Sequence, residues 1–221
     1  MCGPDAAASG FLVESDGRAF VMDMGPGVLG ELQKYWDPSD VDVLLTHLHA
    51  DHCLDIPGLL VWRRFHPTKP AAHRNLLWGP ADTADRLGLA SADTADGFDD
   101  LSDTFDIRTI ERGVTFNVAG LDVEAFPMVH PIEAYGFRVT GPDGVIAYTG
   151  DTGWTDEMVG LARDVDVLIS EATWCGNGYG KPDAMHLTGE EAGRAAARAG
   201  AKRLVLTHIP PYGDPDGAMA A

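Results

Sequence analysis

Positive charge is scarce in this sequence. Sixteen lysine and arginine residues face 34 aspartate and glutamate residues, which gives a net charge of −18, and only four of the cations are lysines. Proteins that bind nucleic acid generally concentrate positive charge along one face, and docking onto anionic lipid requires basic clusters. The composition therefore argues against a general nucleic-acid binder and a lipid-surface protein, and we expect neither stable nucleic-acid binding nor a membrane partner.

Cysteine and long apolar runs are scarce as well. The three cysteines, Cys2, Cys53 and Cys175, show no CxxC spacing, so the sequence indicates neither a disulfide framework nor a zinc ribbon. No apolar run approaches the roughly 20 residues of a membrane-spanning helix, and the N-terminus lacks the pattern of a signal peptide. We therefore expect a cytoplasmic protein with one domain over residues 1–221.

Short β-rich runs alternate with a few segments of helical periodicity. Strands are predicted at residues 11–14, 18–23, 41–46, 105–110, 114–118, 121–128, 135–140, 145–149, 165–171 and 203–207, and helices at 28–35, 56–65, 156–163 and 188–199. Thr188 and Glu191 form a capping-box pattern at the last helix. Residues 91–106, rich in Asp, Ser, Thr and Gly, are interpreted as a solvated loop, with a lid that repels anionic competitors as the alternative.

The strongest functional pattern is a cluster of histidines. Directly after the apolar run at 41–46 the sequence reads Thr46-His47-Leu48-His49-Ala50-Asp51-His52, with four ligand-type side chains within six residues. Because the chain turns at the end of a strand, these side chains can converge, and imidazole beside a carboxylate suits zinc. Three of the eight histidines fall in this segment, so a polar loop that holds them by chance is the weaker alternative. Asp23 is expected to fix the supporting turn.

Further ligand types follow other predicted strands. His130, Asp151 and His208 each come shortly after a strand, and Asp151 lies in a Thr-Gly-Asp-Thr segment. Binding residues of layered folds collect at such strand ends. Either histidine alone would more often be structural, but together with the cluster they indicate a site for two metal ions. His66 and His73 lie outside this pattern and are interpreted as structural or surface residues.

The combination of HxHxDH, a lone histidine, an aspartate in TGDT and a late histidine resembles the metallo-β-lactamase fold superfamily. An aspartate at the fourth motif, Asp151, is similar to the dinuclear hydrolases rather than to the lactamases proper. Two further segments resemble the ribonuclease Z and phosphodiesterase branch: Leu168-Ile169-Ser170-Glu171-Ala172-Thr173 and Met185-His186-Leu187-Thr188. The resemblance covers residues 5–211 and implies an α+β fold, a four-layered αββα sandwich.

The resemblance also implies a role for each site residue. His47, His49 and His130 would hold one divalent metal ion, Asp51, His52 and His208 would hold the second, and Asp151 would bridge them. Zinc is the expected metal, with manganese and iron as alternatives. Two such ions lie about 3.5–4 Å apart and share a hydroxide that attacks phosphorus in line. Asp51 would orient this hydroxide as a base, and His186 would donate a proton or hydrogen bond to the phosphate; a helix-start residue without a role is the alternative for His186.

The sequence departs from this family in three places. Ser170 stands where ribonuclease Z usually has the histidine of a His-Glu-Ala-Thr motif, while Glu171 is kept and is expected to support the site. The 21 residues from His130 to Asp151 leave no room for the long arm with which ribonuclease Z grips tRNA. The sequence also begins after the family's first strand and stops before its last helix and strand, so we expect these elements to be missing.

The predicted function is that of a dinuclear metal-dependent hydrolase that cleaves phosphodiester bonds. Acidic charge and the absent arm disfavour tRNA, a polyanion that many cations must meet, and favour a small substrate such as a 3′,5′-cyclic nucleotide. The overall pattern resembles an actinobacterial cyclic-nucleotide phosphodiesterase group. Arg63 and Arg64 are expected to be mostly exposed, with one able to reach a phosphate. The alternatives are a ribonuclease Z-like tRNA 3′ endonuclease, a non-catalytic metal-binding relic and, disfavoured by the motifs, a thioester or lactone hydrolase. A homodimer is left open.

Overall fold

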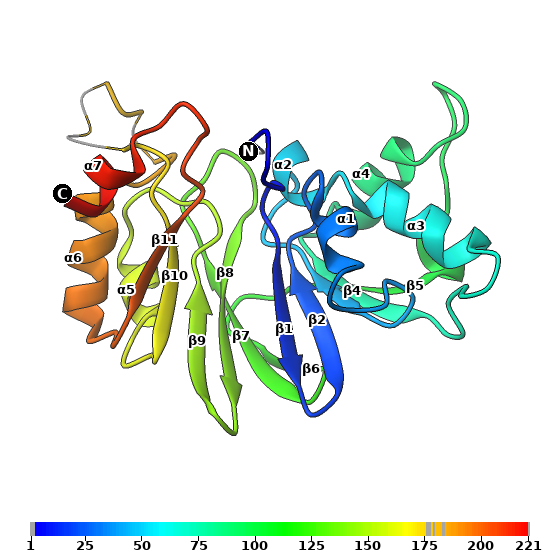
Figure 1. The fold of residues 1–221 in the computed structure, drawn as a ribbon, viewed down its shortest axis with the longest axis horizontal. Coiled ribbons are helices and arrows are strands. Elements are labelled where there is room, and N and C mark those ends of the chain that lie inside the picture. Colours follow the sequence, from blue (N-terminus) through cyan, green and yellow to red (C-terminus); the bar gives the residue numbers. More distant parts are fainter. Residues whose placement is uncertain (1–2, 176–177, 179, 183, 221) are drawn as a thin grey trace. The chain divides into compact units, whose positions relative to one another are not determined.

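The computed structural model describes residues 3–175, 178, 180–182 and 184–220, which form two compact units (Figure 1). The N-terminal unit consists of residues 3–110 and Val118–Gly120, and the C-terminal unit of Glu111–Asn117 and residues 121–220. Two mixed sheets with their helices agree with the predicted α+β class. The assignment of the whole chain to one domain stays a prediction.

The N-terminal unit is built on a five-stranded sheet in the order β1-β2-β3-β4-β5. Its strands are β1 (Phe11–Ser15), β2 (Arg18–Met22), β3 (Asp42–Leu44), β4 (Asn75–Gly79) and β5 (Phe105–Thr109), and its helices are α1 (Val28–Leu32), α2 (Ala50–Cys53), α3 (Ile56–Phe65), α4 (Thr83–Ala90) and the 3-10 helix η1 (Leu101–Asp103). β1 pairs antiparallel with β2, and β2 to β5 run parallel. Val43 and Leu44 of β3 are completely buried, as predicted for a strand covered on both faces.

The C-terminal unit is built on a six-stranded sheet in the order β11-β10-β9-β8-β7-β6. Its strands are β6 (Thr115–Val118), β7 (Leu121–Pro127), β8 (Tyr135–Gly141), β9 (Gly144–Tyr148), β10 (Val167–Glu171) and β11 (Leu204–Thr207), and its helices are α5 (Asp156–Leu161), α6 (Gly189–Ala199) and α7 (Pro215–Ala220). α5 and α6 pack on this sheet over a core that includes Leu161, Leu168 and Ala195. The capping box of Thr188 and Glu191 is confirmed at the start of α6.

The directions of the strands determine which loops share an edge of each sheet. In the C-terminal unit β7, β9, β10 and β11 point the same way, because β8 is antiparallel to both β7 and β9, and β9 to β11 are parallel. Their carboxyl ends therefore meet at one edge, which carries His130, Asp151, Glu171 and His208. In the N-terminal unit Asp23 follows β2, and the histidine cluster follows the parallel neighbour β3.

The sequence analysis misses α2, β4, α4, η1 and α7. β4 is short and ends at Gly79, and α4 contains Gly88, so local propensity is weak in both elements. Tertiary packing requires these glycines, since a Cβ atom at Gly79 would collide with Thr83 and one at Gly88 with the ring of Phe98. Within the described residues, no helix has the length and apolar character needed to cross a membrane.

Arg64 of α3 forms ion pairs with the acidic segment at residues 91–106. Its guanidinium donates to the carboxylates of Asp99 and Asp103, each at 2.7 Å, and to the carbonyl of Asp100 at 2.9 Å. Arg63 is buried, donates to Asn75 and lies 5.1 Å from the centre of the Phe105 ring. The expectation of exposed arginines that contact a phosphate is therefore wrong, because protein groups inside the N-terminal unit hold both guanidinium groups.

Candidate metal centre

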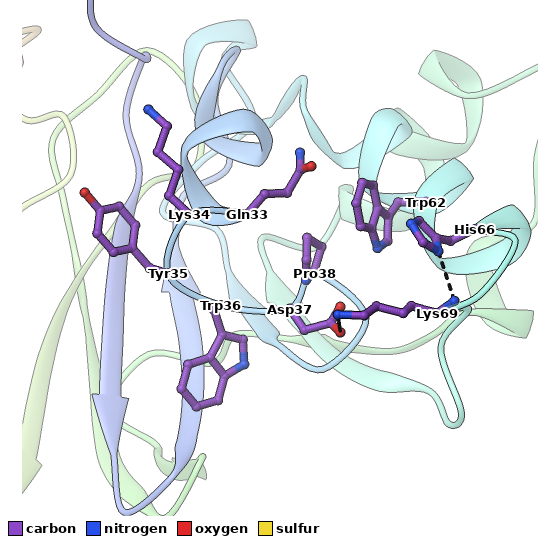
Figure 2. Close-up of a pocket in the computed structure, with 9 residues that line it drawn as sticks. All are labelled: Gln33, Lys34, Tyr35, Trp36, Asp37, Pro38, Trp62, His66 and Lys69. Atoms are coloured by element: carbon purple, nitrogen blue, oxygen red, sulfur yellow. Dashed lines mark hydrogen bonds and ion pairs between the residues drawn. The ribbon is translucent and has the colours of Figure 1, made fainter.

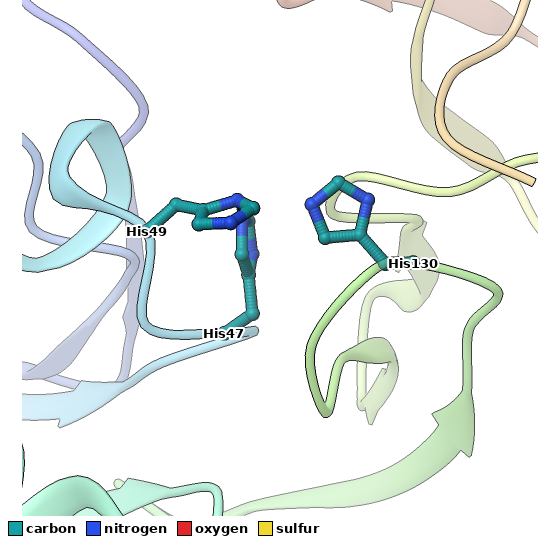
Figure 3. A group of neighbouring side chains, drawn as sticks. All are labelled: His47, His49 and His130. Atoms are coloured by element: carbon teal, nitrogen blue, oxygen red, sulfur yellow. The ribbon is translucent and has the colours of Figure 1, made fainter. Parts of the chain in front are cut away.

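The N-terminal half-site consists of His47, His49, Asp51 and His52. His47 and His49 lie on the loop between β3 and α2 (Figure 3), and Asp51 and His52 belong to α2 itself. Nε2 of His47 lies 3.2 Å from Nδ1 of His49, and the rings of His47 and His52 are 4.1 Å apart between centroids. The turn after the buried strand β3 therefore brings together the imidazoles of the predicted cluster.

Asp23 orients two of the histidines in this half-site. Its buried carboxylate accepts hydrogen bonds from the Thr46 backbone N–H at 2.7 Å, from the Thr46 hydroxyl at 2.9 Å and from Nδ1 of His52 at 2.7 Å. Because the Thr46 hydroxyl donates to Asp23, its oxygen accepts from Nδ1 of His47 at 2.9 Å. The predicted supporting role of Asp23 agrees with these contacts, which commit Nδ1 of both histidines and direct Nε2 of His47 toward His49 and Nε2 of His52 toward the Ser9 hydroxyl at 3.3 Å.

The C-terminal half-site consists of His130, Asp151, His186 and His208. His130 lies on the loop after β7 (Figure 3), Asp151 and His208 follow β9 and β11, and His186 precedes α6. Oδ1 of Asp151 lies 3.5 Å from Nε2 of His208, and Oδ2 lies 3.9 Å from Nδ1 of His186. The ring of His186 is 5.6 Å from the rings of both His130 and His208. Residues from four separate loops thus converge at the edge of one sheet.

Neutral oxygen atoms orient two of these imidazoles. Nδ1 of His130 donates to the carbonyl of Met185 at 3.1 Å, and a carbonyl can only accept. The Thr173 hydroxyl donates to the carbonyl of His208 at 3.1 Å, so its oxygen accepts from Nδ1 of the same residue at 2.6 Å. Both contacts leave Nε2 as the ligand atom. His208 has a φ of 56°, in the left-handed region that residues other than glycine adopt uncommonly.

Glu171 organises the remaining histidine of the C-terminal half-site. This buried carboxylate accepts backbone N–H groups from Thr152 at 2.7 Å and from Leu187 at 3.2 Å, and it also accepts from Nδ1 of His186 at 3.0 Å. A carboxylate at Nδ1 favours the protonated imidazole, in which Nε2 carries a proton that it can donate. Glu171 therefore supports the site as predicted.

The donor set of both half-sites suits a metal. Five histidines of the half-sites have Nδ1 committed to a protein oxygen: His47, His52, His130, His186 and His208. Histidines that bind metals in proteins make this kind of contact, which fixes the tautomer and raises the basicity of the ligand atom. In the C-terminal half-site Asp151, His186 and His208 offer ligand atoms that lie within 4.8 Å of one another. His186 is therefore also placed to act as a ligand, the role that the resemblance does not give it.

Sequence reasoning missed the two hydroxyls that orient the histidines. Thr46 and Thr173 both accept from an Nδ1–H, and both lie within quoted motifs without a role assigned to them. A threonine next to a ligand or after a strand that ends in the site is the signal that could have found them. Cys53, by contrast, faces the protein: its Sγ donates to the carbonyl of His49 at 3.3 Å, and burial and the charge of Asp23 raise the pKa of its thiol to about 11.

Comparison with known protein families decides the assignment. The model of the beta-lactamase superfamily domain matches residues 18–209 of the chain. The chain belongs to this superfamily. Membership confirms the predicted metallo-β-lactamase fold and supports a hydrolase that uses divalent metal ions.

Individual relatives of this superfamily member span most of its length. An uncharacterized protein of Mycobacterium leprae is 50% identical over 214 residues, which cover 96% of this chain and 75% of the relative. The probable metallo-hydrolase YhfI of Bacillus subtilis is 30% identical over 94% of this chain and 82% of its own. The crystal structure of YhfI has a TM-score of 0.83 with 25% identity and covers 99% of this chain and 85% of its own. Human tRNase Z, short form, has a TM-score of 0.75 with 26% identity over 94% and 88% of the two chains, which agrees with the predicted ribonuclease Z-like branch.

Proposed function

We propose that this chain is a dinuclear metal-dependent phosphodiesterase in which the two half-sites combine around the metal ions. His47, His49 and His130 would hold one ion, Asp51, His52 and His208 would hold the other, and Asp151 would be the ligand that both share. The orientation of the imidazoles carries the proposal, since histidines of both half-sites direct Nδ1 to a protein oxygen and keep Nε2 for a ligand bond. This donor set suits zinc first, with manganese or iron as alternatives.

Bound metal ions would polarise the phosphoryl oxygens and lower the pKa of a water molecule. Protein side chains carry out the proton transfers. Asp51, in the first turn of α2, orients the attacking water and accepts its proton. His186 donates a proton from Nε2 to the leaving oxygen, and its contact with the buried Glu171 stabilises the imidazolium that this step needs.

The proposed substrate is a small phosphodiester such as a 3′,5′-cyclic nucleotide. The segment from His130 to Asp151 is occupied by β8, a turn and β9, so it holds no extended arm. The net charge of −18 also weakens the attraction for a folded polyanion, whereas a small ester with one charge needs few cations. We propose that the enzyme acts in the cytoplasm, with neither a nucleic-acid nor a membrane partner.

A ribonuclease Z-like tRNA 3′ endonuclease is the second candidate. It is favoured by the likeness to human tRNase Z and by the Glu171–His186 contact within motifs that resemble that branch. A third possibility, a metal-binding protein without activity, predicts the same metal content and no turnover.

Metal content is the first test of the proposal. Purified protein should contain about two equivalents of divalent metal per chain by elemental analysis, and Asp151→Ala should lower the content of both ions because the bridge contacts both. His73→Ala is the matched control, since His73 is exposed and pairs only loosely with Asp40 at 3.8 Å. A single tightly bound ion that Asp151→Ala leaves in place would contradict the dinuclear centre.

Substrate class is the second test. Metal-loaded protein should hydrolyse cyclic mononucleotides and bis(p-nitrophenyl) phosphate, and cleavage of a tRNA precursor at physiological salt should be negligible. Efficient cleavage of the precursor would promote the endonuclease. Full metal content without turnover of any of the three would favour the inactive metal-binding protein.

A further inference from the structure

A pocket of about 410 Å³ lies in the N-terminal unit between the segment after α1 and the end of α3 (Figure 2). Small-molecule sites in proteins typically fall within about 300–1,000 Å³. Its lining includes Tyr35, Trp36, Asp37, Trp62, His66 and Lys69. Trp62 and His66 belong to the second half of α3, whereas the N-terminal half-site precedes the first residue of that helix. The pocket therefore stands apart from the residues of the proposed metal centre.

Aromatic side chains line this pocket, and Trp62 and His66 together form one wall of it (Figure 2). The indole N–H of Trp62 donates to the hydroxyl of Ser39 at 3.2 Å, and that of Trp36 donates to the carbonyl of Asp40 at 2.6 Å. The ring of His66 packs on Trp62 with 4.4 Å between centroids (Figure 2). Because both indole N–H groups are bonded within the protein, these contacts restrain the orientation of the two rings. Flat aromatic heterocycles are the ligands that such surfaces bind.

Donors for an anion stand beside this wall. Nδ1 of His66 accepts the backbone N–H groups of Lys69 at 2.9 Å and Thr68 at 3.3 Å, so the ring proton of the neutral imidazole is on Nε2. No hydrogen bond from that Nε2 occurs within the described part of the chain. The side chain of Lys69 extends toward Asp37, with 3.3 Å between Nζ and Oδ2, and is 62% exposed (Figure 2). Lys34 and Lys69 are two of only four lysines in an acidic chain, and both line this pocket.

The neighbouring carboxylates limit the charge that the pocket accepts. Glu31 pairs with Lys34 at 2.7 Å, and Asp37 lies beside Lys69. The backbone N–H of Ser39 and the Lys69 ammonium lower the pKa of Asp37, so this carboxyl is ionised at neutral pH. The local charge is therefore close to balanced, which disfavours a ligand with several phosphate groups, such as a triphosphate.

We propose that this pocket binds a nucleoside monophosphate, with its base against the Trp62–His66 wall and its phosphate near Lys69 and the Nε2–H of His66. The site is separate from the proposed metal centre, and it stands whether or not the phosphodiesterase proposal holds.

Nitrogen-15 labelling of the tryptophans in the full, metal-loaded chain tests this site, because the sequence has only five tryptophans. Titration with adenosine 5′-monophosphate should shift the indole signals of Trp36 and Trp62 and leave that of Trp154, which lies in the C-terminal unit, in place. Adenosine, inorganic phosphate and ATP are the comparison ligands, and each should bind at least about tenfold more weakly. Adenosine lacks the phosphate, inorganic phosphate lacks the ring, and ATP carries excess charge.

Two variants localise the binding. Trp62→Leu should weaken binding by about 10- to 100-fold, the usual loss when a base loses its stacking partner. Lys69→Glu changes an exposed side chain and should also weaken binding strongly, whereas Lys202→Glu, the matched exposed lysine in the C-terminal unit, should not. Unmoved Trp36 and Trp62 signals, equal binding of phosphate alone, or equal affinities of Lys69→Glu and Lys202→Glu would overturn the proposal. If the monophosphate binds at the metal centre instead, Lys69→Glu should bind it as tightly as Lys202→Glu does, and this result would contradict the proposal.

Discussion

The two half-sites place the same kinds of ligand by different means. In the N-terminal unit four side chains come from six consecutive residues, and a single buried carboxylate, Asp23, orients His52 directly and His47 through Thr46. In the C-terminal unit the side chains come from loops spread from His130 to His208, and neutral oxygens orient two of them. One arrangement depends on a local turn, and the other on parallel strands that end at one edge. The difference teaches that neighbours in the sequence can supply one half of a candidate metal centre, while the order and direction of the strands bring together the residues of the other half.

The difference extends to the proposed chemistry. Asp51 of the N-terminal half-site is the proposed base, and His186 of the C-terminal half-site is the proposed acid. Nδ1 of His186 contacts the buried carboxylate of Glu171, as Nδ1 of His52 contacts that of Asp23, whereas the other histidines with a fixed Nδ1 face neutral oxygens. Because the proposal leaves His186 outside the ligand set, removal of its side chain should affect the rate without emptying the centre.

His186→Ala is expected to give the largest effect on rate. A positioned acid typically contributes about 10²- to 10⁴-fold, so kcat for a cyclic nucleotide should fall within that range while two equivalents of metal remain. The loss should be much smaller for bis(p-nitrophenyl) phosphate, because nitrophenolate leaves with little protonation. Paired measurements of kcat on both substrates and of metal content check this expectation.

Two outcomes would change the role of His186. Loss of metal would make it a ligand, as its proximity to Asp151 and His208 allows. Equal losses on both substrates would mean that it does not protonate the leaving group, and its contact with Glu171 would then be structural. Glu171→Gln serves as the companion variant, since it keeps the shape but removes the charge that favours the imidazolium.

Asp23→Asn and Thr173→Val compare the supports of the two half-sites directly. An asparagine cannot accept all the hydrogen bonds that Asp23 accepts, and it lacks the charge that makes His52 a better donor to metal. Metal affinity should fall about 10- to 100-fold in Asp23→Asn, the usual loss when such a partner is removed. Thr173→Val removes only a neutral hydroxyl from His208 and should cost less than Asp23→Asn. Competition with a calibrated chelator measures both affinities.

A hydroxyl far from the centre controls for lost stability. Thr155 caps α5 through the backbone N–H of Glu157, so Thr155→Val removes a comparable contact without touching either half-site. Its metal affinity should equal that of the parent chain. If Thr173→Val weakens binding as much as Asp23→Asn does, charge is not what distinguishes the two supports.

These contrasts also explain how far the sequence could be interpreted. The cluster from His47 to His52 could be predicted because its residues are neighbours in the sequence, and the capping box at Thr188 could be predicted for the same reason. His130, Asp151 and His208 could be associated only through strand ends and the family resemblance. β4 and α4 were missed because their glycines serve tertiary packing against local propensity. The burial of Arg63 and the ion pairs of Arg64 were also missed, because the acceptors of both side chains lie 10 to 40 residues away along the chain.

The smallest expected effect concerns the segment that carries His186. Nζ of Lys181 donates to the carboxylate of Glu191 at 2.8 Å and to the carbonyl of His186 at 2.9 Å. Burial acts to raise the pKa of Glu191, but the hydrogen bonds from Lys181 and from the Thr188 N–H outweigh it and lower the pKa below 4.5. A carboxyl with a lowered pKa in the folded state stabilises the fold above its unfolded pKa, and this stabilisation is lost as pH falls through the folded pKa.

Glu191→Gln should therefore destabilise the chain at pH 7 by no more than about 1 kcal/mol, and by progressively less as the pH falls below 4.5. Glutamine can still complete the capping box at Thr188, so the variant isolates the charge from the cap. Glu31→Gln in the N-terminal unit removes the matched but exposed pair with Lys34 and should change stability little at either pH. Urea unfolding of both variants at pH 7 and pH 4 measures the difference. An equal loss at both pH values would show that Glu191 acts through packing, and the acid sensitivity of this segment would then need another titrating group.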